Sequence, residues 1–484
     1  MGCQQVTSED TVVRLDGQTL TTDGLLAVAS GAAAIEVDPV ALGRIGDRHA
    51  ALDDARARGA VYGANTGVGA NRHESTGDDL DHGLRLLRSH CAATGPVEDD
   101  VTARAAMTVR LNQILAGGSG ISRRVTDALA EAVRSGAVPT LHSWGAIGTA
   151  DLAALAELGL TLAGERPWRY GPGPVTTIDA TDALPMISSS ALTVATAVLA
   201  LDRVHTQLRA STVIAALTFL ALQGNPGAYE AVVHQARAHP GQVEVAGMLR
   251  RLVAGSGAPA RIQDPFGLRV LPQVTAPAVH AVDALHDVLT AELNAAVENP
   301  LVTADGVHHH GQFHTATLAS SLDAVRGTFL PVLSLSSARL GLLMRPDLTG
   351  LRAFLAAGPA GSSGLMISEY VVQDLLTEIR VGMQPVAAGT LTISLGLEEH
   401  ASFATQGARS LRRMSHYAPT LLAAELVAAV RALRMAPGRL TDGPVRQAFE
   451  IAAAALEPSF EDRPLGTDLE RAAAVLPELA LVAA

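Results

Sequence analysis

The second half of this chain is a succession of long Ala- and Leu-rich segments in which apolar residues recur at helical spacing. That spacing places them on one helix face, and helices of this length bury such faces by packing side by side. Aromatic residues make up only 3% of the sequence, which also favours helices over sheets. The pattern predicts a mainly α fold with a long helical bundle over residues 191–484. Its helices are expected at 191–222, 276–298, 317–341, 366–381, 397–414, 419–435 and 443–456.

Residues 1–190 predict a separate, mixed N-terminal domain, because short extended signals alternate there with shorter helical ones. Val13–Leu20 carries turn residues at Asp16-Gly17 and predicts a small β-hairpin. Capping residues and periodicity predict the helices that follow. They are expected at 22–31, 39–58, 84–90, 99–115 and 152–162.

The charge of the chain restricts its partners. The formal net charge is −12, and all 36 basic residues are arginine because the sequence has no lysine. A lysine Schiff base, a pyridoxal phosphate anchor and a P-loop lysine are therefore excluded. An acidic chain with scattered arginines repels phosphate backbones, so we expect no nucleic-acid partner.

Cysteine usage and hydropathy bear on the compartment. Cys3 and Cys91 are the two cysteines, and they do not form a disulfide framework, which indicates a reducing environment. The N-terminus lacks the basic start and apolar core of a signal peptide. The longest apolar runs, such as 213–222, are shorter than a bilayer span. We expect a cytoplasmic protein with no membrane partner.

One short loop before the bundle is a candidate reactive centre. Trp144-Gly-Ala-Ile-Gly-Thr-Ala-Asp151 leads directly into the apolar helix predicted at 152–162. The free amides and the dipole at a helix N-terminus favour negative charge there. A plain turn with Asp151 as N-cap would explain the same residues. The earlier Gly-rich loop, Tyr62-Gly-Ala-Asn-Thr-Gly-Val-Gly69, lacks the spacing of a dinucleotide fingerprint, which argues against nucleotide binding.

Several short blocks, in a fixed order along the chain, resemble the aromatic amino acid ammonia-lyase and aminomutase family, which includes histidine ammonia-lyase. The Tyr62–Gly69 loop is similar to the family's Tyr-Gly-Val-Asn-Thr-Gly-Phe-Gly. The resemblance implies the helical fold of the fumarase/aspartase-like lyase superfamily and a homotetramer whose active sites draw residues from three subunits. The other blocks are Arg88-Ser-His-Cys91, His239-Pro-Gly-Gln242, Leu271-Pro-Gln-Val274, Glu298-Asn-Pro-Leu301, Gly311-Gln-Phe-His314 and Glu398-Glu-His-Ala-Ser402.

The family builds its electrophile, a methylidene-imidazolone, by condensing an Ala-Ser-Gly triad just before the aspartate of this loop. The triad positions here are Gly148, Thr149 and Ala150. The Thr149 methyl group would crowd the electrophilic carbon, and the Cβ of Ala150 would hinder a turn that glycine makes easily. We therefore expect no cofactor, with a methylidene-imidazolone-type group from Gly148-Thr149-Ala150 as the disfavoured alternative.

Three further positions depart from the family pattern. Ser188-Ser-Ser190 replaces Asn-Gly-Thr, so the Asn that supports the electrophile is missing. Phe266 replaces a functional Tyr in Gln263-Asp-Pro-Phe-Gly-Leu-Arg269 and cannot exchange a proton. Leu397 stands where a Gln usually precedes Glu.

Other positions retain the family's functional residues. Tyr62 corresponds to the catalytic Tyr, whose pKa must lie well below its free value of about 10 if it acts as a base at neutral pH. Arg269 corresponds to the carboxylate-binding Arg, whose planar fork suits bidentate recognition. The catalytic candidates are Tyr62, Thr149, Ser188 and Glu398, and the substrate-binding candidates are Gly69, His90, Phe266, Arg269 and Phe313. No metal is expected at His308-His-His310 with His314, because adjacent histidines on one loop rarely bind the same ion.

Without the electrophile, a Tyr base and an Arg clamp suit a substrate whose proton is already acidified by a carbonyl, or a Michael acceptor. We expect an enzyme that eliminates, adds, cyclises or isomerises an anionic or carbonyl-bearing small molecule in specialised metabolism. Two alternatives stay open: a genuine ammonia-lyase or aminomutase with a Thr-derived prosthetic group, and an inactive homologue that binds a ligand. By the resemblance, Tyr62, Phe313 and Glu398 need not meet Thr149 within one chain.

Overall fold

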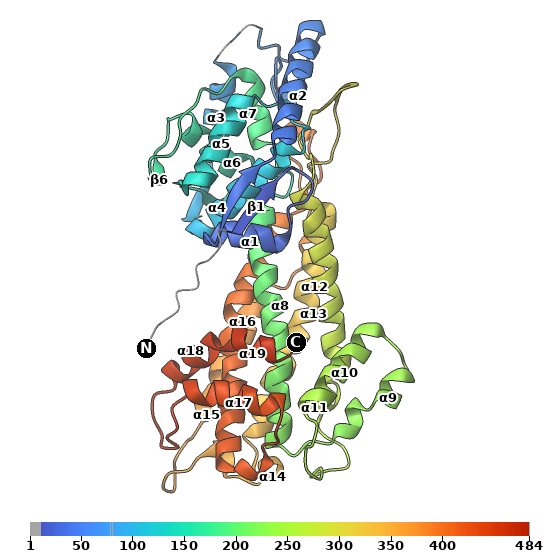
Figure 1. Cartoon of the computed structure of the whole chain (residues 1–484), viewed down its shortest axis with the longest axis vertical. Helices are drawn as coiled ribbons and strands as arrows, with labels where there is room; N and C mark the ends of the chain where they lie inside the picture. The colour runs from blue at the N-terminus through green and yellow to red at the C-terminus, as the bar shows by residue number, and fades with distance from the viewer. Residues whose placement is uncertain (1–10, 78, 80, 484) are drawn as a thin grey trace. The chain divides into compact units, whose positions relative to one another are not determined.

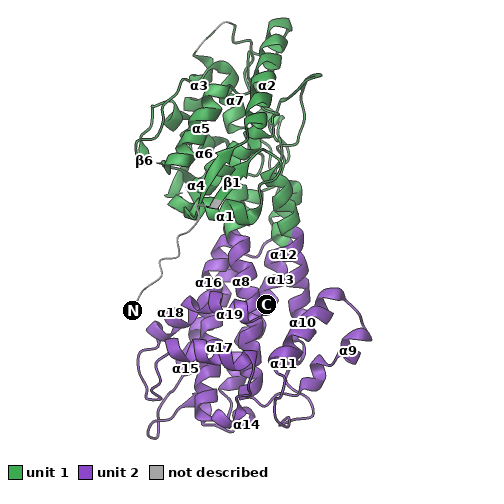
Figure 2. Ribbon diagram, viewed as in Figure 1, with its two compact units in different colours: residues 1–199, 285–323, 385–409 green, residues 200–284, 324–384, 410–484 purple. Residues whose placement is uncertain are grey.

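The computed structural model describes residues 11–77, 79 and 81–483 and divides into two compact units (Figure 2). Unit 1 comprises residues 1–199, 285–323 and 385–409. Unit 2 comprises residues 200–284, 324–384 and 410–484. This division differs from the single cut at residue 190 that the sequence predicts, because two later segments pack on the N-terminal part of the chain.

Unit 1 begins with a parallel pair of strands rather than the predicted hairpin. The first strand pairs with a second that lies beyond a helix, so Val13 is paired with Ile35. The Asp16 carboxylate accepts hydrogen bonds from the backbone N–H groups of Gln18 and Thr19, which directs the chain into that helix. The three elements are β1 (Thr11–Leu15), α1 (Thr22–Ser30) and β2 (Ala33–Val37).

The rest of unit 1 is helical, with short antiparallel strand pairs between the helices (Figure 1). Its helices are α2 (Pro39–Arg58), α3 (His82–His90), α4 (Asp100–Leu115), α5 (Arg123–Ser135), α6 (Leu152–Leu162) and α7 (Ala180–Ile187). The strand pairs are β3 (Thr94–Val97) with β5 (His142–Trp144), β4 (Val138–Pro139) with β6 (Trp168–Tyr170), and β7 (Leu301–Thr303) with β8 (Gly306–His308).

Four long helices confirm the mainly α fold. They are α8 (Ala191–Ala221), α12 (Leu271–Leu293), α13 (Ala316–Leu343) and α16 (Ala404–Met435), and in unit 2 α8, α13 and α16 run side by side. The prediction of separate helices at 397–414 and 419–435 is wrong. Residues 397–403 form a loop, and α16 continues through Pro419, which removes one backbone donor without ending the helix.

Shorter helices complete unit 2. They are α9 (Ala231–Gln235), α10 (Pro240–Leu252), α11 (Phe266–Arg269), α14 (Pro346–Thr349), α15 (Met366–Val381), α17 (Pro444–Ala455), α18 (Gly466–Ala474) and α19 (Leu476–Val482).

One apolar stretch is longer than the sequence analysis predicts. Residues 180–221 are long and apolar enough to cross a bilayer, but 94% of the most apolar window is buried inside the structure. This burial is expected of a central core helix, which is apolar on all sides because it is packed on all sides.

Candidate active site

One cavity in unit 1 collects most of the predicted site residues. It encloses about 870 Å³, which is within the size range of small-molecule sites. Tyr62, Phe313 and Glu398 line the same cavity as Thr149 within one chain, although the resemblance did not require this. The predicted residues in its lining are Tyr62, Gly69, His90, Thr149, Ser188, Phe313 and Glu398.

Two predicted substrate-binding residues do not line this cavity. Phe266 and Arg269 form the ends of α11 in unit 2. The Arg269 guanidinium lies 4.8 Å from the centre of the Phe266 ring and donates a hydrogen bond of 2.6 Å to Gln263. Phe266 is 63% exposed. Among the described residues, the lining of the unit 1 cavity therefore does not include the predicted carboxylate clamp, Arg269.

The first triad residue, Gly148, occupies a position where only glycine fits. Gly148 has φ +83°, and a Cβ there would lie 2.0 Å from Ser402 Oγ and 2.7 Å from the Ala404 amide nitrogen. Its carbonyl oxygen accepts hydrogen bonds from the hydroxyls of Ser402 at 2.8 Å and Thr315 at 2.9 Å. The family's alanine at this position would displace the 402–404 backbone or the Ser402 side chain.

The third triad residue and the following aspartate fix the end of the loop. Ala150 has φ +107°, a conformation that costs a residue with a Cβ about 1–3 kcal/mol. Asp151 is fully buried and does not cap α6 with its side chain, so the N-cap interpretation is wrong. Its carboxylate instead accepts hydrogen bonds of 2.7 Å from the Thr193 amide and hydroxyl, while burial raises its pKa. Among the residues that the structure describes, no side chain caps the N-terminus of α6.

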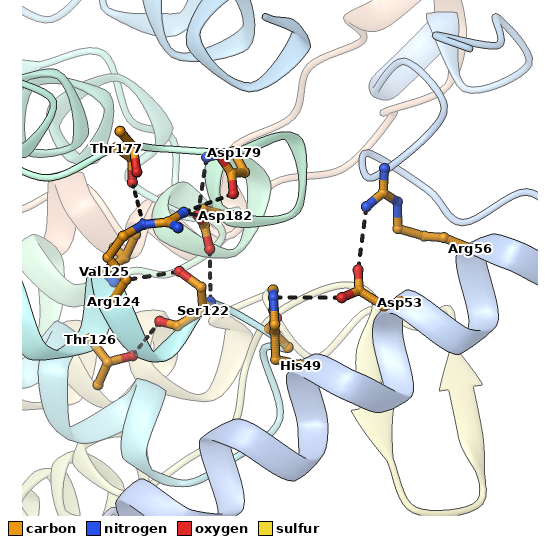
Figure 3. Close-up of polar contacts among 11 residues, drawn as sticks. His49, Asp53, Arg56, Ser122, Arg124, Val125, Thr126, Thr177, Asp179 and Asp182 are labelled. Carbon is orange, nitrogen blue, oxygen red and sulfur yellow. Dashed lines mark hydrogen bonds and ion pairs between the residues drawn. The ribbon is translucent and has the colours of Figure 1, made fainter. Parts of the chain in front are cut away.

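Helix α7 delivers Ser188 to the cavity wall. Asp179 and Asp182 form a capping box at its start, and the Arg124 guanidinium bonds both carboxylates (Figure 3). Asp182 also accepts a hydrogen bond of 2.7 Å from the Ser122 amide, which joins α7 to the start of α5. At the other end, Ser188 Oγ accepts a hydrogen bond of 3.2 Å from the Asn299 amide. Ser188 therefore positions the Asn299 backbone.

A buried ion pair links the end of α7 to the Asn299 loop. The Arg110 guanidinium donates to Glu298 Oε1 at 2.7 Å and to the carbonyl of Pro185 at 2.5 Å. Both charged side chains are almost completely buried. Arg110 Nη1 and Glu298 Oε2 have no hydrogen-bond partner among the described residues. The pair holds two cavity-forming segments together, although these two atoms make no hydrogen bond within the described residues.

Tyr62 does not have the lowered pKa that a base would need. Its Oη accepts a hydrogen bond of 2.7 Å from the Gly69 amide. Burial raises the pKa of the phenol, the Gly69 hydrogen bond opposes that shift, and the nearby Glu398 charge adds to it. The prediction of a lowered pKa is therefore wrong for this cavity. At neutral pH the phenol is protonated and suited to donate a hydrogen bond or a proton.

Histidines form a large part of the cavity wall, and sequence analysis selected only one of them. His90 Nδ1 lies 2.9 Å from the Leu86 carbonyl oxygen, which makes Nδ1 the donor and leaves Nε2 with the lone pair. His310 Nε2 lies 2.8 Å from the Glu298 carbonyl, and its Nδ1 accepts from the Gln312 amide, so both nitrogens are occupied.

The other lining histidines are His309, His314 and His400. His314 Nε2 and His400 Nδ1 are 2.9 Å apart. Both residues belong to blocks that the sequence analysis recognised, 311–314 and 398–402, but the resemblance directed attention to Phe313 and Glu398 instead. No group of three or more histidine, cysteine or acidic side chains suited to a metal occurs among the described residues.

Charged side chains give the cavity mixed polarity. Arg72 supplies a guanidinium to the lining, opposite in charge to Glu398 and Glu399. Sequence analysis missed Arg72, because an arginine after a Gly-rich loop carries no distinctive spacing. A ligand with an anionic group and a polar or cationic group would match this lining.

The chain belongs to the aromatic amino acid lyase family, whose model matches residues 20–454. It is 33% identical to histidine ammonia-lyase of Geobacillus kaustophilus over 87% of this chain and 88% of that one. Histidine ammonia-lyase from Trypanosoma cruzi has a similar structure, with a TM-score of 0.88, 28% identity and coverage of 98% and 95%. The fold is also that of ergothionase from Treponema denticola, at a TM-score of 0.89, 22% identity and coverage of 97% and 99%. The expected family and its helical lyase fold are thereby confirmed.

Proposed function

We propose that this lyase-family enzyme works without a methylidene-imidazolone and catalyses acid–base elimination, addition, cyclisation or isomerisation of an anionic or carbonyl-bearing small molecule. The observation that carries the proposal is the environment of Gly148, where a side chain has no space and the carbonyl oxygen is hydrogen-bonded. Cyclisation would require the Ala150 nitrogen to attack the Gly148 carbonyl carbon and the carbonyl oxygen to leave as water. That oxygen is buried and accepts hydrogen bonds from two hydroxyl groups, and position 148 has no space for the family's alanine.

The remaining cavity residues suit chemistry that needs no added electrophile. Tyr62 presents a neutral phenol that can hydrogen-bond or protonate an enolate oxygen or a leaving group. Arg72 and the uncapped N-terminus of α6 favour an anionic substrate group. Ser188 and Glu398 complete the polar wall beside Thr149. We propose that the enzyme is soluble and cytoplasmic and that it acts in specialised metabolism.

The intact mass of the purified chain tests the first part of the proposal. We expect the full mass of the sequence, with Thr149 unmodified. A mass lower by two water molecules would contradict the proposal and favour an ammonia-lyase or aminomutase with a Thr-derived group. The same sample, digested with a protease, localises any loss of water to the peptide that contains residues 148–150.

Deuterium exchange tests the chemistry. Phenylpyruvate carries a carboxylate and an acidified methylene group, and its exchange in D₂O is followed by NMR with and without protein. We expect faster exchange with the wild-type chain and a loss of about 100-fold with Tyr62→Phe, which removes the phenol but keeps the ring. Acceleration that is equal in the two proteins would show that Tyr62 is not catalytic. No acceleration by either would favour a ligand-binding homologue.

We also propose a homotetramer in which Phe266 and Arg269 of another copy complete the cavity. Phe266 is 63% exposed and neither residue lines the cavity of unit 1, which supports this arrangement. Co-expression of Tyr62→Phe and Arg269→Ala chains tests it. Shared sites predict that mixed oligomers regain part of the activity that each variant lacks alone. Light scattering gives the oligomeric state, and a monomer with full activity would contradict the proposal.

A further inference from the structure

The cavity needs a proton acceptor, because Tyr62 is protonated at neutral pH. Among the described residues, His90 keeps Nε2 free beside its hydrogen bond to a backbone carbonyl, and the histidines at positions 310, 314 and 400 can be sorted by which ring nitrogen is engaged. His310 uses both nitrogens in hydrogen bonds to the backbone and is excluded. In His314, Nε2 faces Nδ1 of His400 at 2.9 Å. In His400, Nδ1 is engaged, and Nε2 has no hydrogen-bond partner within the part of the chain that the structure describes.

The hydrogen bond between the two rings limits their tautomers. It joins His314 Nε2 to His400 Nδ1 at 2.9 Å, so one of these nitrogens donates and the other accepts. When His314 accepts at Nε2, His400 donates from Nδ1 and has its lone pair at Nε2.

We propose that His400 Nε2 is the general base of this site and that His314 is a positioning residue which fixes its tautomer. This inference rests on the acid–base function proposed above. The substrate proton moves from carbon to His400 Nε2, and the electron pair of the broken C–H bond remains on the substrate as an enolate. The Tyr62 phenol hydrogen-bonds the enolate oxygen. The proton held by His400 returns to a different carbon in an isomerisation or to the leaving group in an elimination.

The electrostatics of the pair support a single proton acceptor. Burial lowers the pKa of His314, and the charge of His400 lowers it further. These two effects favour a neutral His314, which can accept the hydrogen bond from His400. The other titratable or charged groups around the cavity are Tyr62, Arg72, His90, His309, His310, Glu398 and Glu399.

The loop geometry also supports this role. Ser402, two residues after His400, is 2% exposed and donates to the Gly148 carbonyl. Before it, Ile393 and Glu398 form an antiparallel bridge. His400 therefore lies between two anchored points on the segment that also holds the triad loop, which restricts where its ring can move.

Variants at three histidines test the assignment in the phenylpyruvate exchange assay. His400→Asn removes the base, and we expect a loss of about 100-fold or more. His314→Phe removes the acceptor, and we expect a loss of about 10-fold, whereas His314→Gln keeps an acceptor oxygen and restores most of the rate. His308 does not line the cavity, so His308→Asn is the matched control and stays at the wild-type rate. Exchange by His400→Asn within about twofold of wild type would overturn the proposal.

Acylation by diethyl pyrocarbonate gives a readout that does not depend on turnover. The reagent attacks unprotonated imidazole nitrogens, and peptide mass spectrometry locates the product. We expect His400 to react faster than His310, with a rate that rises with pH, and His314→Phe to slow the reaction. An unreactive His400 would overturn the assignment. A reactive His400 in a wild-type chain that exchanges no deuterium would instead contradict the proposed function and leave the basic nitrogen assigned.

Discussion

The two units each contain a buried Arg–Glu ion pair, but the pairs are satisfied to different degrees. In unit 2, Arg339 binds both oxygens of Glu425, at 2.6 and 2.8 Å. Glu425 also accepts from the hydroxyls of Thr218 and Ser336, and Arg339 donates its third nitrogen to the Gly267 carbonyl. In unit 1, one nitrogen of Arg110 and one oxygen of Glu298 lack partners among the described residues.

The difference distinguishes an ion pair with a purely structural role from one that lies beside the candidate active site. A buried charge is tolerated when every lone pair and proton is bonded, as in unit 2, where α8, α13 and α16 are tied together. In unit 1 the pair positions the cavity segments, but two of its polar atoms have no hydrogen-bond partner among the described residues. Residual polarity and backbone strain, as at Ala150, are typical of functional sites.

Breaking the pair in unit 2 should have the largest effect on stability. Arg339→Met leaves Glu425 charged and buried, and we expect a loss of about 3–5 kcal/mol in the free energy of unfolding. Urea denaturation measures it. The double variant Arg339→Met/Glu425→Leu should recover most of the loss, because no charge remains buried. A double variant as unstable as the single one would mean that packing, not charge, holds these helices.

Breaking the pair in unit 1 should cost less stability and more activity. Glu298→Gln leaves the buried Arg110 without its counter-charge but keeps a hydrogen-bond acceptor for it, so we expect a loss of about 1–3 kcal/mol. The deuterium exchange rate should fall, because the adjacent Asn299 lines the cavity. A stability loss equal to that of Arg339→Met would remove the distinction between the two pairs.

A half-buried acid of unit 1, Glu292, makes stability depend on pH. Burial raises its pKa from 4.5 to about 7. The folded state therefore binds a proton that the unfolded state has released, and stability declines as pH rises from about 4.5 through 7. The decline reaches up to about 3 kcal/mol, because each pKa unit corresponds to about 1.4 kcal/mol. Thermal unfolding of wild type and Glu292→Gln across this range measures it, and parallel curves would contradict the assignment.

Relieving strain at the triad loop should have the smallest effect. Ala150→Gly permits φ +107° without a Cβ penalty, and we expect a gain of about 1 kcal/mol. Thermal unfolding measures it. Ala153→Gly, inside α6, is the control and should destabilise the chain, because glycine is costly within a helix. Destabilisation by Ala150→Gly would show that the positive φ is not strained.

Particular residues show how much of the fold and of the site could be predicted from the sequence. The periodicity of 366–381 predicted helix α15 with its bounds, because an amphipathic stripe is written in neighbouring residues. The blocks around Tyr62, Phe313 and Glu398 indicated site residues, and these line one cavity although the resemblance did not require them to meet within one chain. The hairpin at 13–20 failed because a local turn signal cannot show that β1 pairs with a strand beyond α1. The lowered pKa of Tyr62 failed because burial is a property of the folded chain.

The sequence by itself determined the helical architecture, the family and the loss of the Ala-Ser-Gly triad, since each depends on residue types and their order. Tertiary structure decided what those residues do. It made Gly148 obligatory by placing Ser402 against it, although 254 positions separate the two. It also brought His314 and His400 together and left Arg269 out of the lining of the unit 1 cavity. Such effects come from contacts between distant segments, which spacing along the chain does not encode.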